Sequence, residues 1–125
     1  MVISPGTTPE LLTAAAKSDV PFIPGVATAS EAMVAATYGF KILKFFPAGA
    51  SGGVAALKGF AGPLSHLKFC PTGGVNKENM SDYLALPNVF AVGGSWMVPT
   101  DLIDAGRFDD VTALAKAAIA GVRNG

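Results

Sequence analysis

A lysine within an apolar segment is the residue whose setting most clearly suggests chemistry. In "FKILKFFPAG" (residues 40–49), Lys44 has apolar neighbours on both sides, and alternation along a strand places it on one face with Ile42 and Phe46. Burial removes water from an ammonium and favours the neutral amine, the form that attacks a ketone to give a Schiff base. We therefore predict that Lys44 is a reactive amine and that Lys41 opens the strand and reaches water. The alternative is a lysine that extends to solvent or finds a buried partner.

Two pairs of glycines follow expected strands and suggest a site for an anion. Gly73 and Gly74 in "PTGGVNKEN" precede a helix that we expect Asn76 to cap, and backbone N–H groups at such a helix start bind phosphate. The segment "VGGSW" repeats the arrangement one strand later with Gly94 and adds the hydroxyl of Ser95. Each pair alone fits a plain turn equally well. Glycines after the last two strands together match the usual phosphate site of parallel βα barrels.

Three other residues with reactive or aromatic side chains have structural interpretations. His66 comes before a strand, at the end opposite the expected site, so we predict a structural or surface role. Cys70 is expected to pack in the core, and Trp96 to pack beside the second glycine pair. No cluster of histidine, cysteine and carboxylate has metal-ligand spacing, so we expect neither a metal nor another cofactor. A single cysteine forms no internal disulfide and fits a reducing, cytoplasmic compartment.

The elements that must position these residues form a repeated unit. A short apolar run ends in proline or glycine, and a polar turn then leads to an amphipathic stretch. The spacing of roughly 20 residues suits a strand followed by a crossover helix rather than a hairpin. Five runs have this form: "VISPG" (2–6), "VPFIPG" (20–25), "KILKFFPA" (41–48), "LKFCPTGG" (67–74) and "VFAVGGS" (89–95).

Helix signals separate the apolar runs. Thr8 followed by Pro9 is typical of an N-cap and first helical position, and Thr28 with Glu31 is a capping box. Apolar residues also recur at helical spacing at positions 53–60 and 111–122.

Apolar runs without clear alternation indicate strands buried on both faces, as in a parallel sheet covered by helices. A doubly wound sheet and part of a TIM barrel both fit this pattern. A complete barrel has eight strands and needs roughly 200 residues or more, so five strands in 125 residues cannot close one. The expected fold is α/β, a partial TIM (β/α)8 barrel of about five βα units with a C-terminal helix, in one domain over residues 1–125.

The composition excludes several classes of partner. Nine basic and nine acidic residues give no net charge, so nothing favours nucleic acid or an anionic membrane surface. Every apolar run is broken within about ten residues, whereas a membrane span needs roughly 20. The start "MVISPGTTPE" lacks the basic and apolar regions of a signal peptide.

Five motifs together resemble one known family. The segments "SPGTTPELL", "PFIPGVATASEAM", "KFFPA", "FCPTGG" and "VGGSWMVP" are similar, in this order and spacing, to the C-terminal portion of the KDPG/4-hydroxy-2-oxoglutarate (KHG) aldolase family, where KDPG is 2-keto-3-deoxy-6-phosphogluconate. The resemblance implies a metal-independent class I aldolase on a TIM barrel. Such an enzyme cleaves KDPG into pyruvate and glyceraldehyde 3-phosphate. It also implies a homo-oligomer, since the family is often trimeric.

The resemblance assigns roles to individual residues. Lys44 matches the lysine that forms the Schiff base, Phe46 matches an aromatic residue lining that pocket, and Thr72 matches a threonine that influences stereoselectivity. The phosphate-binding positions of the family correspond to Gly73, Gly74, Gly94 and Ser95.

The chain also departs from the family pattern. The family's general base is a glutamate on an early strand, where an arginine and a threonine help to bind the pyruvyl group. This chain begins at what would be the fourth strand, and none of its nine carboxylates is expected at the carboxyl end of a strand. Gly49 also replaces a glutamate that is common in the family, which we expect to alter a loop.

Three hypotheses therefore remain. The first is aldolase chemistry through Lys44. The second is a catalytically incomplete half-barrel that binds phosphate or pyruvate, or associates with a missing N-terminal part or another copy. An open barrel has two unpaired strand edges, which favours such association. The third, on fold grounds alone, is another Schiff-base barrel or a phosphate-binding isomerase.

Overall fold

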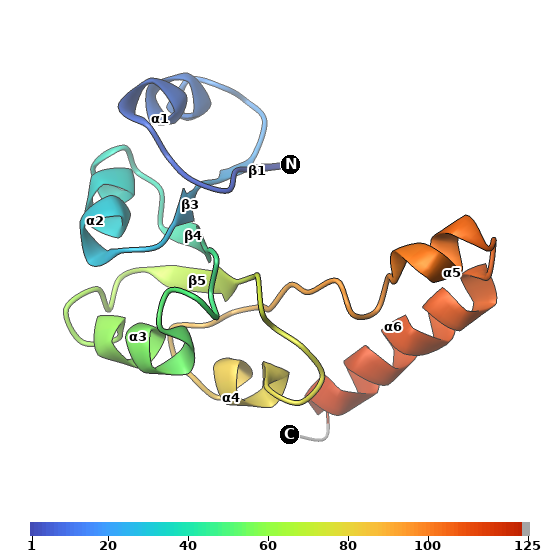
Figure 1. The fold of residues 1–125 in the computed structure, drawn as a ribbon. Helices are drawn as coiled ribbons and strands as arrows, with labels where there is room; N and C mark the ends of the chain where they lie inside the picture. Colours follow the sequence, from blue (N-terminus) through green and yellow to red (C-terminus); the bar gives the residue numbers. More distant parts are fainter. Residues whose placement is uncertain (124–125) are drawn as a thin grey trace.

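The computed structural model describes residues 1–123 of the chain, and up to α4 its helices separate the strands of successive predicted units (Figure 1). The strands are β1 (Val2–Ile3), β2 (Phe22–Ile23), β3 (Gly25–Val26), β4 (Ile42–Phe45) and β5 (Lys68–Pro71). The helices are α1 (Pro9–Ala16), α2 (Ala29–Thr37), α3 (Gly53–Phe60), α4 (Met80–Leu84), α5 (Thr100–Asp104) and α6 (Phe108–Arg123).

The strands form a parallel wall in chain order. β1 pairs with β2, and β3 pairs with β4, which pairs with β5. Only Pro24 separates β2 from β3, and Ser4 joins the two sheets because its N–H donates to the carbonyl of Ile23 while its hydroxyl accepts from the N–H of Gly25. Gly25 is so close to the backbone of Ser4 and Pro5 that a Cβ atom there would overlap it. The wall is therefore continuous from β1 to β5.

The fifth predicted strand, residues 89–95, is not a regular strand. Two isolated parallel bridges, Phe69 with Val89 and Thr72 with Gly93, connect it to β5. Pro71 has no N–H, so β5 cannot donate a ladder hydrogen bond at the position between these bridges. The segment from Val89 to Gly93 is also one residue longer than its counterpart on β5, as in a bulge. The prediction was correct in position and direction but wrong in regularity.

Two predicted helix starts are confirmed, and one is wrong. The hydroxyl of Thr8 accepts from the N–H of Leu11, and Thr28 forms the capping box with Glu31. Asn76, however, does not cap α4, which begins four residues later at Met80. Its side-chain oxygen instead accepts from two backbone N–H groups inside the turn that precedes the helix, at 3.0 and 3.1 Å. The Asn76 side chain therefore accepts from backbone N–H groups as an N-cap would, but it stabilises the turn before α4.

The core lies on one face of the wall. Leu43, Phe45 and Phe69 are fully buried, and the ring of Phe60 on α3 meets that of Phe45 edge to face at 6.0 Å. Burial alternates along β4 and β5, and Ile42 on the opposite face is 46% exposed. Helices α1, α2 and α3 lie along the buried side (Figure 1). The prediction of strands buried on both faces is therefore wrong, because helices cover only the outer face of this open wall.

Within residues 1–123, no helix is both long enough and apolar enough to cross a membrane.

Candidate active site

Lys44 lies on the inner, uncovered face of the wall. Its register partners are Gly25 on β3 and Cys70 on β5, so one neighbouring strand presents no side chain beside it. The side chain is half-buried rather than enclosed, and Nζ lies 4.4 Å from the centroid of the Phe46 ring. Lys41, by contrast, is exposed as predicted. The structure therefore places the amine against an aromatic face, on a surface that a ligand can reach.

Cys70 is beside Lys44. The prediction that it packs in the core is wrong. It is half-buried on the inner face, because alternation directs Phe69 and Pro71 into the core. Burial raises the pKa of the Cys70 thiol, and the positive charge of Lys44 acts in the opposite direction. Cys70 thus forms part of the surroundings of the amine as a neutral thiol.

The raised pKa of Cys70 gives a measurable expectation. Because the thiolate is the reactive form, the alkylation rate of the folded chain should reach half its maximum at a higher pH than that of the urea-unfolded chain. The measurement is the rate of iodoacetamide labelling as a function of pH, with and without urea. Coincident midpoints would show that burial does not disfavour the thiolate.

Thr72 continues the inner face beyond Cys70, at the carboxyl end of β5. Its hydroxyl oxygen is buried and has no hydrogen-bond partner among the described residues. Its methyl group lies 2.8 Å from the position that a Cβ atom of Gly93 would occupy, so only glycine leaves room for Thr72 there. A buried hydroxyl without a partner lowers the stability of the fold, so this group stands out among those of the inner face.

The first glycine pair forms a tight turn that two asparagines hold. Gly73 and Gly74 have φ values of +83° and +81°, which L side chains rarely adopt. The Nδ2 of Asn79 donates to the carbonyl of Gly74 at 2.9 Å, and its Oδ1 accepts from the N–H of Asn76 at 2.9 Å. Asn79 was not among the residues predicted from the sequence. Its signal was the N-x-x-N spacing, which allows each asparagine to bond the other's backbone.

The second glycine pair lies against the first. A Cβ atom on Gly94 would overlap the ring of Trp96 and lie 2.9 Å from the carbonyl oxygen of Val75, the residue after the first pair. Ser95 is exposed at this position, whereas Trp96 packs against the core as predicted. The two predicted anion-binding segments are therefore brought together. His66 is exposed, as expected of a surface residue.

No carboxylate joins this group in the part of the chain that the structure describes. The carboxylates lie in helices and in the turns beside them. Glu31 comes nearest along the chain to a strand end, but its Oε2 accepts from the N–H groups of Ala27 and Thr28 at 2.6 and 3.0 Å. Residues 1–123 also contain no group of three or more histidine, cysteine, aspartate or glutamate side chains able to hold a metal ion. The arrangement provides an amine and hydrogen-bond donors for an anion, but no free carboxylate that could act as a base.

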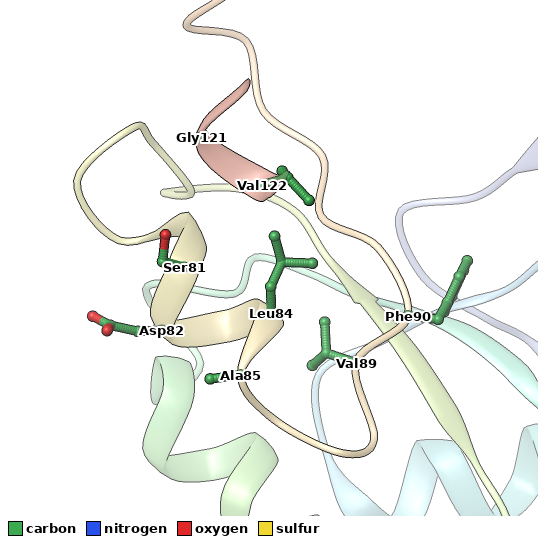
Figure 2. A pocket seen from close by; sticks show the side chains of 8 residues that line it. All are labelled: Ser81, Asp82, Leu84, Ala85, Val89, Phe90, Gly121 and Val122. Atoms are coloured by element: carbon green, nitrogen blue, oxygen red, sulfur yellow. The ribbon is translucent and has the colours of Figure 1, made fainter. Parts of the chain in front are cut away.

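A separate pocket of about 510 Å³ lies between α4 and α6 (Figure 2). Leu84, Val89 and Val122 line it with other side chains, and neither Lys44 nor the glycine turns contribute to it. Its lining contains one carboxylate, Asp82, which points away from the apolar centre in Figure 2. No lysine lines this pocket, so it offers no amine for a Schiff base.

A wall of parallel strands with helices on its outer face, and with its polar groups gathered at the carboxyl ends of the strands, is part of a βα barrel. The comparisons with known proteins agree. A profile of the family described as "KDPG and KHG aldolase" matches residues 1–114. The chain belongs to this KDPG and KHG aldolase family.

Individual relatives are similar over nearly the whole chain. The KHG/KDPG aldolase of Escherichia coli K12 is 52% identical over 121 residues, which is 97% of this chain and 57% of the relative. The 2-dehydro-3-deoxy-phosphogluconate aldolase of Dickeya dadantii is 53% identical over 95% of this chain and 56% of its own length. A crystal structure of KDPG aldolase from Legionella pneumophila, which captured pyruvate as a covalent carbinolamine, is 50% identical with a TM-score of 0.91 over 93% of this chain and 56% of its own. The chain thus spans a little over half the length of these relatives.

Proposed function

We propose that the chain supplies the Schiff-base lysine and the phosphate site of a class I aldolase that cleaves KDPG into pyruvate and glyceraldehyde 3-phosphate. The observation that carries this proposal is the position of Lys44 on the uncovered inner face, on the strand next to Thr72 and the glycine turn. The names of the relatives favour KDPG and 4-hydroxy-2-oxoglutarate as substrates.

In the proposed mechanism, the neutral amine of Lys44 attacks the ketone carbon, and the resulting carbinolamine takes up a proton and loses water to form an iminium ion. The iminium withdraws electrons as a base removes the proton of the C4 hydroxyl. The C3–C4 bond then breaks, releasing the aldehyde and leaving an enamine. Protonation of the enamine at carbon and hydrolysis of the imine release pyruvate and restore the amine.

The other residues hold the substrate. We assign the phosphate to the backbone N–H groups of Gly73, Gly74 and Gly94 and to the hydroxyl of Ser95, because the residues of two neighbouring glycine turns supply backbone donors without Cβ atoms, which suits an anion. The orphaned hydroxyl of Thr72 is assigned to a polar group of the substrate near the reacting carbons.

The base is assigned to polypeptide outside this chain. The described residues leave no unengaged carboxylate at the strand ends, and the relatives are longer. We also propose that residues 1–125 form one domain and that the complete assembly is a homo-oligomer, with a trimer as the expected form. The proposed location is cytoplasmic.

A second candidate function is a non-catalytic half-barrel that binds phosphate or pyruvate and associates with other polypeptide. The observation that favours it is the exposure of an apolar side chain on the inner face, where Ile42 is 46% exposed. The interior of a closed barrel is filled by such side chains.

One assay separates the two candidates: the release of pyruvate from KDPG by the chain alone, and by the chain mixed with the part of the Escherichia coli relative that it does not cover. Without a base, the chain alone should be about 10²–10⁴-fold slower than the intact relative, and the mixture should recover activity. A full rate from the chain alone would place the base within it or in a second copy. If the mixture forms a complex but does not cleave KDPG, the result favours the second candidate.

A further inference from the structure

The ring of Phe46 is close to both the amine of Lys44 and the turn at Gly73. Nζ of Lys44 lies over the ring, 4.4 Å from its centroid. The position of a Cβ atom on Gly73 would be 3.0 Å from Cε2 and 3.1 Å from Cδ2 of the same ring. The ring therefore contacts the glycine backbone directly, and Gly73 has no side chain that could yield.

We propose that Phe46 is a positioning residue that couples the glycine turn to the amine of Lys44. The ring holds the amine through its electron-rich face and takes its own position from the backbone of Gly73. This inference rests on the proposed function in so far as Lys44 is the imine-forming amine and Gly73 belongs to the phosphate site. Occupation of the phosphate site then changes the reactivity of the amine through one side chain.

The physical basis is that a cation–π interaction acts on the ammonium and not on the neutral amine. Among the register partners of Lys44, Gly25 has no side chain and Cys70 is a neutral thiol, so no carboxylate on either neighbouring strand competes with the ring for the charge. Displacing the ring, or making its face less electron-rich, should therefore weaken the interaction with the ammonium and raise the reactivity of the Lys44 amine toward electrophiles.

The first test replaces Phe46 with phenylalanines carrying one and then three ring fluorines, which weaken the electron-rich face with little change in shape. The readout is the rate at which limiting acetic anhydride acetylates Lys44, measured by peptide mass spectrometry with Lys41, the residue before β4, as internal reference. We expect the rate to rise in the order of fluorination, by about two- to fivefold in total, as for a partly exposed cation–π pair. A rate that is constant along the series would show that the ring only packs.

The second test examines the coupling with a matched pair of variants. Gly73→Ala and Gly39→Ala each place a Cβ atom at positive φ, but the new atom meets the Phe46 ring in the first and open space in the second. We expect Gly73→Ala to change the relative acetylation of Lys44 at least twofold and Gly39→Ala to leave it near the wild-type value. Equal changes would mean that a strained backbone loosens the chain generally and that the ring transmits nothing.

If Gly73→Ala does not fold, inorganic phosphate added to the wild-type chain serves instead. Saturating phosphate should change the acetylation of Lys44 relative to Lys41, and the change should disappear in Phe46→Leu. A phosphate effect that persists in Phe46→Leu, or no effect at all, would contradict the coupling. Acetylation needs no pyruvate, so a chain that shows the fluorine series but forms no pyruvate adduct would refute the proposed function alone.

Discussion

Replacement of Lys44 by methionine is expected to abolish the pyruvate adduct that borohydride traps on the chain. Methionine retains an unbranched apolar stem but has no amine, so it cannot form the imine that borohydride reduces to a stable secondary amine. Because Lys44 is half-buried beside Phe46 and Cys70, an apolar replacement should not disturb the wall. The measurement is the intact mass of the protein after treatment with pyruvate and borohydride.

Lys41→Met provides the matched control for this substitution. Lys41 lies on the same segment, three residues earlier, but is exposed and has no contact with the aromatic ring. We expect this variant to be labelled as strongly as the wild-type chain. If Lys44→Met retains the adduct while Lys41→Met loses it, the assignment of the nucleophile is wrong.

Replacement of Phe69 by alanine is expected to lower the free energy of unfolding by about 3–5 kcal/mol. Phe69 is fully buried on β5, and its ring centroid lies 5.9 Å from that of Phe60 on α3. The substitution removes the contact that attaches this strand to its helix and leaves a cavity. Since a domain is typically stable by only about 5–15 kcal/mol, the loss should also weaken binding at Thr72, which follows on the same strand.

Phe108→Ala is the control for the core substitution, because Phe108 is 61% exposed at the start of α6. We expect it to change stability by less than about 0.5 kcal/mol. Urea denaturation followed by circular dichroism measures both variants. Similar losses for the two would mean that the outer face of β5 is not the centre of the core.

The elements that depend on local chemistry could be predicted from the sequence. The caps at Thr8 and Thr28 need only nearby backbone N–H groups, and both form as expected. The parallel order of β3, β4 and β5 follows from the spacing of the apolar runs. Lys44, Thr72 and the two glycine turns also gather at one region, because the carboxyl ends of parallel strands meet there.

Features that depend on contacts between distant parts of the chain could not be predicted in this way. A strand that is buried on one face has the same apolar residues as one destined for a closed barrel, so the exposure of Ile42 had no signal in β4. The irregular segment beside β5 depends on a missing N–H at Pro71 and on one extra residue opposite it. The contact between Phe46 and Gly73 depends on two positions 27 residues apart in the chain, which no local pattern connects.

Lys44, among all the lysines of the chain, is the one that we propose forms the imine. The most direct test is a peptide map of the wild-type chain after incubation with pyruvate and borohydride, with the adduct quantified at every lysine. We expect the adduct to be concentrated on the peptide that contains Lys44 and exposed lysines such as Lys41 and Lys77 to remain near background. An adduct spread evenly over the exposed lysines, with none in excess at Lys44, would contradict it.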